Sequence, residues 1–225
     1  MARLPRLFLP DFPQLLRLQA LPHLRAFESR EQYARFLSLL ETHARLLNVQ
    51  VHAYALLPES ALLLVSTSQP GTLGQWVQAV NREFVPWRMQ GGGSLWLPRF
   101  KSTVVQPGLW ALRAALWVDS APLRAGVSSD AALYPFCSFA AHTGVTKDKL
   151  LTDLPVYFSL GNTPFDRQMA FRQLAEQGIG EAATQRLNAG LEKAWAVADE
   201  AKLQAVQATL ERPLQPRPRG RPRKV

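Results

Sequence analysis

Hydrophobic positions follow a two-residue period in some stretches of the chain and a helical period in others. The segment HAYALLPESALLLV, residues 52–65, holds two apolar runs on either side of the polar turn Pro58-Glu59-Ser60. Strand-length apolar runs joined by a short turn that contains proline are typical of a β-hairpin buried on at least one face. We therefore predict strands over 49–57 and 61–66 and place them at the centre of a sheet.

Helical spacing of apolar residues predicts three helices around this hairpin, over 29–47, 73–89 and 107–118. Ser29 and Gln32 have the spacing of a capping box, which fixes the start of the first helix. Pro86 is expected to end or kink the second helix, and Pro107 suits the beginning of the third. Partial alternation predicts two further strands, over 14–21 and 95–105.

The C-terminal third of the chain is predicted to be mainly helical. Residues 130–144 read as a loop, and helices are expected over 163–175 and 181–210, separated by Gly178 and Gly180. The resulting order β-α-β-β-α-β-α predicts an α+β fold: a ferredoxin-like split β-α-β core, an antiparallel sheet with helices on one face, followed by a helical extension and a disordered basic tail. The expected divisions are an arm (1–13), the ferredoxin-fold domain (14–145), the extension (146–211) and the tail (212–225).

The charge of the chain favours a polyanionic partner. The net charge is +9, and the segment from Arg212 onward supplies six basic residues and no acid. A basic tail on a mildly basic body indicates nucleic acid, whereas an anionic membrane fits less well because the tail has no apolar face to insert. Apolar runs fall short of the ~20 residues that a membrane span needs. We expect a cytoplasmic protein, with nucleoid association as one option.

Cysteine and histidine usage limits the metal chemistry that the chain could carry. The single cysteine, Cys137, excludes an intramolecular disulfide and a multi-cysteine metal site, and it is predicted to be a small buried residue. None of the four histidines stands two residues from another histidine. The sequence therefore offers no histidine pair that a strand would point in one direction.

Six short motifs, in order, resemble one family, the REP-associated tyrosine transposases, a branch of the single-tyrosine HUH transposases. Each motif alone is weakly specific, but together they extend over nearly the whole chain. The matching segments are RLFLP (6–10), VHAYALLP (51–58), SLWLPRFKS (94–102), PLRAG (122–126), YPFCSF with AAHTG (134–144) and RPRGRPRK (217–224).

The resemblance implies a ferredoxin-like fold that binds single-stranded or hairpin DNA and cuts it through a phosphotyrosine. In such a centre two histidines, one residue apart on a strand, and an asparagine hold Mg²⁺ or Mn²⁺, which polarises the phosphate. A helix tyrosine then attacks the phosphate. The matching positions here are Ser60 and Leu62 for the histidines, Trp117 for the tyrosine and Ala121 for the asparagine. The family's Arg-Gly after the first strand is also lost, at Gln19-Ala20.

These replacements predict a catalytically inactive member of the family, without a metal cofactor, that retains DNA binding. Basic residues beside aromatic ones suit phosphate contact and base stacking, and the tail segment 219–222, RGRP, has the core pattern of an AT-hook for A/T-rich minor grooves. Solvated strand-end charges, closure of a helix end and nonspecific phosphate binding are the competing explanations. The candidate DNA-binding residues are Arg99, Lys101, Arg124, Arg219, Arg221, Arg223 and Lys224.

Two other functions stay open on the sequence. One is an active single-strand transposase or nuclease whose catalytic residues have moved, which a covalent protein–DNA adduct would reveal. The other is a protein–protein interaction module, in which the apolar sheet and the C-terminal helices serve a partner. The resemblance also leaves a homodimer open, because related transposases often work as dimers.

Overall fold

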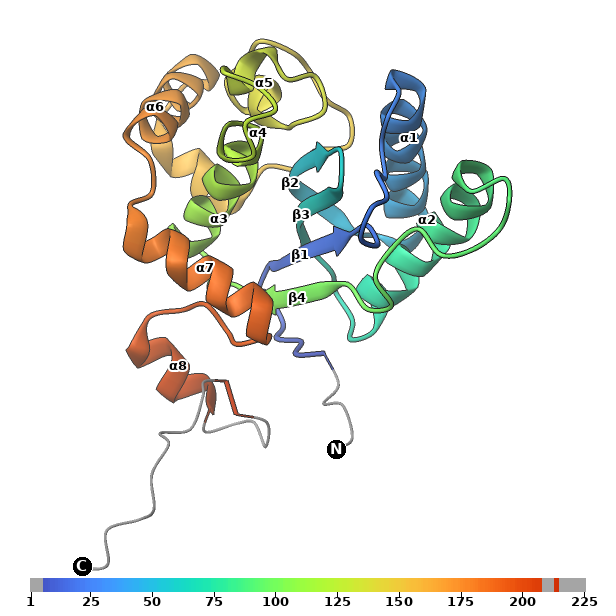
Figure 1. Cartoon of the computed structure of the whole chain (residues 1–225). Coiled ribbons are helices and arrows are strands. Elements are labelled where there is room, and N and C mark those ends of the chain that lie inside the picture. The colour runs from blue at the N-terminus through green and yellow to red at the C-terminus, as the bar shows by residue number, and fades with distance from the viewer. Residues whose placement is uncertain (1–5, 208–212, 215–225) are drawn as a thin grey trace, which may run out of the picture.

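The computed structural model describes residues 6–207 and 213–214, and its first half follows the predicted order of strands and helices (Figure 1). Among the described residues, no helix combines the length and the apolar character needed to cross a membrane. The elements are β1 (Gln14–Gln19), α1 (Arg30–Leu47), β2 (Gln50–Leu57), β3 (Ser60–Ser66), α2 (Thr72–Arg88), β4 (Lys101–Val104), α3 (Leu109–Asp119), α4 (Ala121–Arg124), η1 (Ala131–Leu133), α5 (Phe139–His142), η2 (Pro155–Leu160), α6 (Pro164–Gln177), α7 (Glu181–Lys193) and α8 (Glu200–Gln207).

The four strands form one antiparallel sheet in the order β2-β3-β1-β4. Strands β1 and β2 run parallel to each other with β3 between them, and α1 connects them. This is the split β-α-β arrangement. The predicted α+β fold class, with a ferredoxin-like core, is therefore confirmed.

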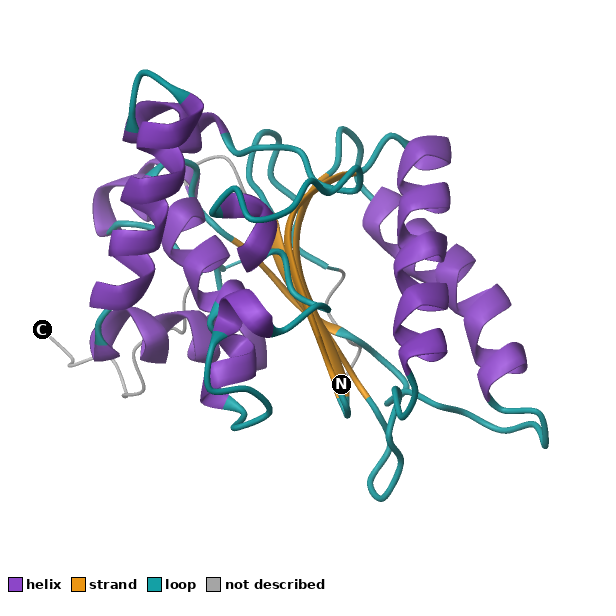
Figure 2. Ribbon diagram, turned by 90° about the horizontal axis from the view of Figure 1, so that it is seen from above, coloured by secondary structure: helices purple, strands orange, loops and turns teal. Residues whose placement is uncertain are grey.

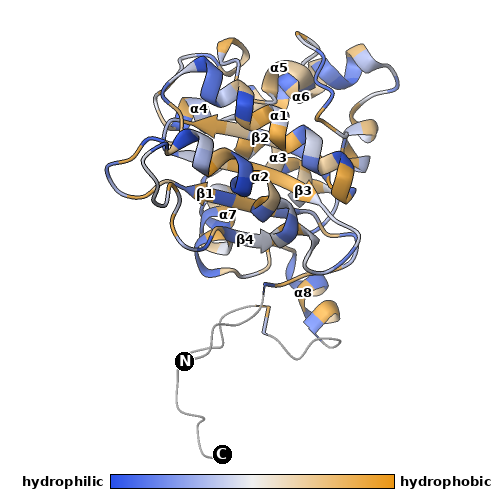
Figure 3. Ribbon diagram, turned by 90° about the vertical axis from the view of Figure 1, so that its right-hand side faces the viewer, coloured by the Kyte–Doolittle hydropathy of each residue, from blue (hydrophilic) through white to orange (hydrophobic). Residues whose placement is uncertain are grey.

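Helices cover both faces of the sheet, as the edge-on view of the strands in Figure 2 shows. Alternation along β3 sends Leu63 and Val65 into a core with α1 and α2, while Leu62 and Leu64 join a second core with α3, α6 and α7. The two core helices share one face, and α3 with the C-terminal helices covers the other. Burial on both sides explains why the ALLLV run is continuously apolar (Figure 3).

The start of α1 has the predicted capping box. The backbone N–H of Gln32 donates to the Ser29 hydroxyl, and the Gln32 side chain accepts from the Ser29 N–H. The helix ends at Asn48, which adopts the left-handed conformation (φ 51°) that asparagine tolerates. These local signals place α1 within one residue of its predicted limits.

Strand β4 is shorter than predicted because of proline. The strand predicted over 95–105 has a regular ladder only over Lys101–Val104, while Trp96 makes a single bridge to Ala20 on the other side of Pro98. Proline cannot donate to a ladder, so the strand is interrupted. Helix α2, by contrast, lies within one residue of its predicted limits, 73–89, and continues through Pro86.

The C-terminal third contains more short elements than predicted. The helix expected over 181–210, with an interruption at Gly190, is instead divided after Gly190: α7 ends at Lys193, Ala194 is left-handed (φ 56°), and α8 begins at Glu200. The stretch expected to be a loop over 130–144 contains the one-turn helices η1 and α5. These breaks follow tertiary packing that local propensity does not encode.

Both edges of the sheet are covered by later parts of the chain. Along β2, the N–H of Leu56 donates to the Phe136 carbonyl (2.9 Å) and the N–H of Thr152 donates to the Val51 carbonyl (2.8 Å). Along β4, Val197 donates to the Val104 carbonyl (2.9 Å) and accepts from the N–H of Gln106 (2.8 Å). The chain after β4 therefore supplies partners to backbone groups on both edge strands.

Candidate functional site

Three of the four positions matched to the transposase centre belong to the apolar core between the sheet and α3. Leu62 on β3, Trp117 on α3 and Ala121 at the start of α4 are all buried members of one apolar cluster. Ser60 lies two residues before Leu62 on the same strand, so its side chain points to the same face. Ser60 is buried as well.

The side chains at these positions do not fit a divalent cation. They offer one hydroxyl, an alkyl chain, an indole and a methyl group, whereas Mg²⁺ and Mn²⁺ take carboxylate, carbonyl or imidazole ligands. Within residues 6–207 and 213–214, no group of three or more His, Cys, Asp or Glu side chains is placed to hold a metal ion. No metal-dependent step can be assigned to these four residues.

The same face of the sheet also carries two cations, beside the apolar side chains of Leu62 and its cluster. In the cross-strand register, Leu62 of β3 lies opposite Arg17 of β1, and Arg17 lies opposite Lys101 of β4. Neighbouring strands are about 4.8 Å apart, so the three side chains form a row across the sheet. We call Arg17 and Lys101 the cationic pair. Arg17 is a functional candidate that sequence reasoning missed, although a lone arginine among alternating leucines in 14–21 was a signal for it.

Glu192 of α7 bridges the cationic pair. One carboxylate oxygen accepts from the guanidinium of Arg17 and the other from the ammonium of Lys101. The side chains of Arg17, Lys101 and Glu192 keep 25%, 37% and 42% of their surface exposed. Burial lowers the pKa of Lys101, and the nearby Arg17 lowers it further. The carboxylate thus holds two like charges together at a surface that solvent still reaches.

Arg124, a predicted DNA contact, lies against the indole at the tyrosine position. Its guanidinium is 4.5 Å from the centroid of the Trp117 ring, and it donates to the Ser120 hydroxyl. Burial lowers the pKa of Arg124 to about 10, which still leaves it charged at neutral pH. Among the described atoms, the indole N–H of Trp117 is buried without a hydrogen-bond partner.

The other predicted DNA contacts are separated from this face or undescribed. Arg99 lies close enough to Arg6 to lower its pKa, after the larger effect of burial, and Arg6 stacks 3.7 Å from the centroid of the Phe100 ring. Lys101, the first residue of β4, pairs with Glu192. The predicted tail contacts lie outside the described residues: Arg219, Arg221, Arg223 and Lys224.

None of the four tyrosines has a free hydroxyl that could serve as a relocated nucleophile. Burial, the largest cause in each case, raises the pKa of every one of them. The Tyr54 hydroxyl donates to Asp148 (2.6 Å), that of Tyr134 to the Leu56 carbonyl (2.6 Å), that of Tyr157 to the His142 carbonyl (2.7 Å), and Tyr33 is hydrogen-bonded to Tyr134.

A buried ionic network lies behind the site at the end of α3, and sequence reasoning missed it. Asp119 is fully buried and accepts from His142 Nδ1 (2.6 Å) and from the Ser138 hydroxyl. Burial alone would lower the pKa of His142, but the Asp119 carboxylate, the charge of Asp153 and a hydrogen bond to the His52 carbonyl outweigh it, so the pKa is raised. The network fixes the end of α3, and with it Trp117, to α5.

Comparison with known proteins supports the fold and leaves the family unassigned. No family model matches the sequence, and no curated protein matches it. Among solved structures, the chain is similar to a REP-associated tyrosine transposase bound to a REP hairpin, with a TM-score of 0.55 and 13% identity. The match covers 68% of this chain and 99% of that one. At this identity the likeness concerns the fold.

Proposed function

We propose that this protein binds hairpin or single-stranded DNA across the α3 side of its sheet and does not cut it. The observation that carries the proposal is the cationic pair, Arg17 and Lys101, on one face of a fold shared with a transposase that was solved with a DNA hairpin. Two neighbouring cations on a sheet suit successive phosphates of a nucleic-acid backbone.

The chemistry of the neighbouring side chains supports binding without cleavage. Cleavage through a phosphotyrosine needs an ionisable nucleophile and, in the family that the sequence resembles, a metal. Trp117 and Leu62 provide neither, and the raised pKa values of all four tyrosines disfavour the phenolate form. The filled apolar cluster around Leu62 instead stabilises the fold by burial.

Substitution of the cationic pair tests the proposal directly. In R17Q/K101Q, loss of two phosphate contacts is expected to weaken binding of a hairpin oligonucleotide by about ten- to a hundredfold at low salt. The slope of log K against log salt should become shallower by about 0.7–0.9 per lost contact. Fluorescence anisotropy over a salt series measures both, and the same mixtures with Mn²⁺ are expected to give no covalent adduct on denaturing gels.

The matched control is Arg82→Gln, which removes an exposed arginine from α2 on the opposite face of the sheet. The affinity of this variant for the hairpin should stay within about twofold of the wild-type value, since loss of the Arg82 charge changes only the long-range electrostatic field. Equal losses in both variants would refute this face as the binding surface. Absence of salt-dependent DNA binding in the wild-type protein would favour a protein–protein module instead, and an adduct would establish an active enzyme.

Glu192 is expected to compete with DNA for the cationic pair. Its carboxylate occupies the donors that phosphates would use, so Glu192→Gln should raise hairpin affinity by about two- to tenfold, the magnitude of two exposed ion pairs. Glu176→Gln removes the same charge from an exposed position on α6 and serves as the control. A rise of equal size in both variants would mean that net charge, rather than the bridge, sets the affinity.

The basic tail is proposed to add affinity for duplex DNA rich in A·T pairs. Truncation before Arg212 removes six positive charges. We expect a clear loss of affinity and a shallower salt slope. Competition between A/T-rich and G/C-rich duplexes separates minor-groove insertion from general phosphate binding, and unchanged affinity after truncation would refute any role of the tail.

A further inference from the structure

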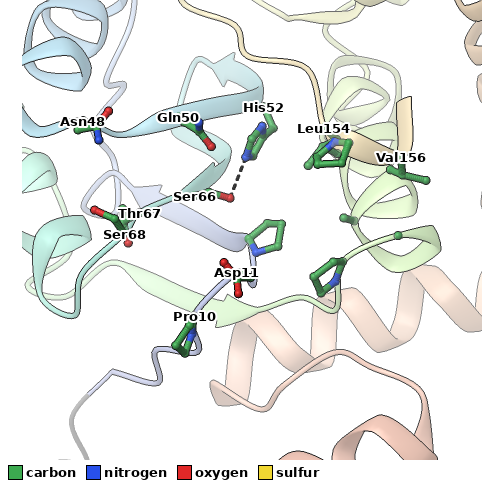
Figure 4. A pocket seen from close by; sticks show the side chains of 15 residues that line it. Pro10, Asp11, Asn48, Gln50, His52, Ser66, Thr67, Ser68, Leu154 and Val156 are labelled. Carbon is green, nitrogen blue, oxygen red and sulfur yellow. Dashed lines mark hydrogen bonds between the residues drawn. The ribbon is translucent and has the colours of Figure 1, made fainter. Parts of the chain in front are cut away.

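A pocket of about 430 Å³ lies on the α3 side of the sheet, at the end of β3 opposite Ser60. Figure 4 shows Gln50 and His52 of β2 beside Ser66 of β3, with Leu154 and Val156 across the pocket. Prolines of the N-terminal arm, the start of α3 and η2 complete an apolar wall. Size and lining fall in the range of small-molecule sites, which combine apolar walls with a few placed polar groups.

Some polar groups of the pocket are already hydrogen-bonded within the protein, and others can still bond to a ligand. His52 Nδ1 donates to the Thr152 carbonyl (2.7 Å), and His52 Nε2 accepts from the Ser66 hydroxyl (2.8 Å). The Ser66 oxygen can therefore only accept from a ligand. Thr67 accepts from the Gln14 amide (3.3 Å) and keeps its own O–H as a donor. Among the described residues, the Gln50 amide makes no hydrogen bond, so it offers both a donor and an acceptor.

The charges at the pocket argue against an anionic ligand. No lysine or arginine occurs among the described residues that line it, and Asp11 contributes a carboxylate. Burial lowers the pKa of His52, so its imidazole stays neutral. Together with the Asn48 amide and the Ser68 hydroxyl, which also line the pocket, the groups left over are a hydroxyl donor, a hydroxyl acceptor and the Gln50 amide edge, between apolar walls. A neutral planar heterocycle with its own donors and acceptors matches this set.

We propose that this pocket binds a nucleobase, with the Gln50 amide pairing with the base edge as glutamine does with adenine. The base could come from a free nucleoside or from an unpaired position in DNA. The second source rests on the proposed DNA binding, whereas the first does not. The phosphates of a DNA strand would stay outside the pocket.

Binding of the four free deoxynucleosides, measured by NMR chemical-shift titration of the full chain, tests the pocket without DNA. At least one deoxynucleoside should saturate shifts of residues 48–52 and 66–68, and Gln50→Leu should weaken that binding at least tenfold. Gln78→Leu, on an exposed part of α2, is the control and should leave it unchanged. Val156→Phe narrows the half-buried pocket wall and should also abolish binding.

The DNA arm compares a hairpin carrying one unpaired base with the same hairpin carrying an abasic site there. If the source is DNA, base removal should weaken binding at least tenfold in wild type and hardly at all in Gln50→Leu. No shift at millimolar nucleoside together with no abasic effect would overturn the proposal, as would nucleoside binding that Gln50→Leu leaves intact. If the protein binds no DNA, the proposed function is refuted. The nucleoside titration then still decides whether the pocket binds a nucleobase.

Discussion

Asp119→Ala is expected to lower the free energy of unfolding by about 3–5 kcal/mol near neutral pH, the cost of leaving a buried charge without its partner. Asp119 is fully buried, accepts from His142 Nδ1 at 2.6 Å and also accepts from Ser138. His142 is equally enclosed and holds a second hydrogen bond to the His52 carbonyl. Removing the carboxylate leaves His142 Nδ1 without its acceptor, whereas the Ser138 hydroxyl keeps the Tyr54 carbonyl (3.1 Å) as an acceptor.

The same substitution should reverse the pH dependence of stability. In the wild type the pKa of His142 is raised, so its contribution is full below the unfolded value of about 6.5 and is lost as pH rises through the folded value. Without Asp119, burial, the largest single cause, is opposed only by the charge of Asp153 and the His52 carbonyl, so we expect the pKa of His142 to fall below its ordinary value and stability to be lost instead on acidification below about pH 6.5. Urea unfolding between pH 5.5 and 8.5 measures both slopes.

The double variant D119N/H142Q controls for the loss of packing. It removes both charges while keeping hydrogen-bonding groups of similar size, so most of the stability should return and the slope should flatten. If the double variant is as unstable as Asp119→Ala, the ion pair is not the cause. If Asp119→Ala keeps the wild-type slope, His142 does not titrate with this carboxylate.

Gly190→Val is expected to destabilise the protein by about 1–3 kcal/mol through overpacking between α7 and the sheet. A Cβ at Gly190 would lie 2.5 Å from Val197 Cγ2 and 3.0 Å from the Trp195 carbonyl oxygen. Val197 is fully buried and its backbone is hydrogen-bonded to Val104 of β4. The Trp195 carbonyl oxygen belongs to the backbone, so it cannot move away by a change of side-chain rotamer. Either α7 or the 195–198 segment must shift.

The matched control is Ala189→Val, an exposed position one residue earlier in the same helix. At this exposed position valine lowers the free energy of unfolding only through its weaker helix propensity, by at most about 0.7 kcal/mol. Urea unfolding of both variants gives the difference. Equal destabilisation would show that β-branching in α7, rather than the close approach to Val197, limits this position.

The order of the core elements was predictable because each rests on a local pattern. The capping box at Ser29 and the apolar runs around Pro58 act over a few residues, and neither depends on the rest of the chain. Leu62 and Trp117 belong to one apolar cluster, in keeping with strand alternation and the family resemblance. Division of the last helix at Ala194 could not be predicted, since contacts of Trp195 and Val197 with the sheet decide it.

The ionic parts of the site escaped prediction because they join distant residues. Glu192 meets Lys101 across 91 positions and Arg17 across 175, and neither separation leaves a periodic signal in the sequence. Asp119 and His142 are only 23 residues apart. Their pairing still depends on how the segment after α4 turns back onto α3, which turn chemistry alone does not fix.

The covered edges of the sheet have a consequence for synthesis of the chain. All four strands have been translated once Val104 is complete, yet the partner of that edge, Val197, follows more than 90 residues later. At about 5–20 residues per second a ribosome needs roughly 5–20 s to add that stretch. During this interval the β4 edge would be open to pairing with another nascent chain, whereas Phe136 and Thr152, the partners of the β2 edge, are synthesised earlier. Crowded polysomes are therefore where this protein is most exposed to misassembly.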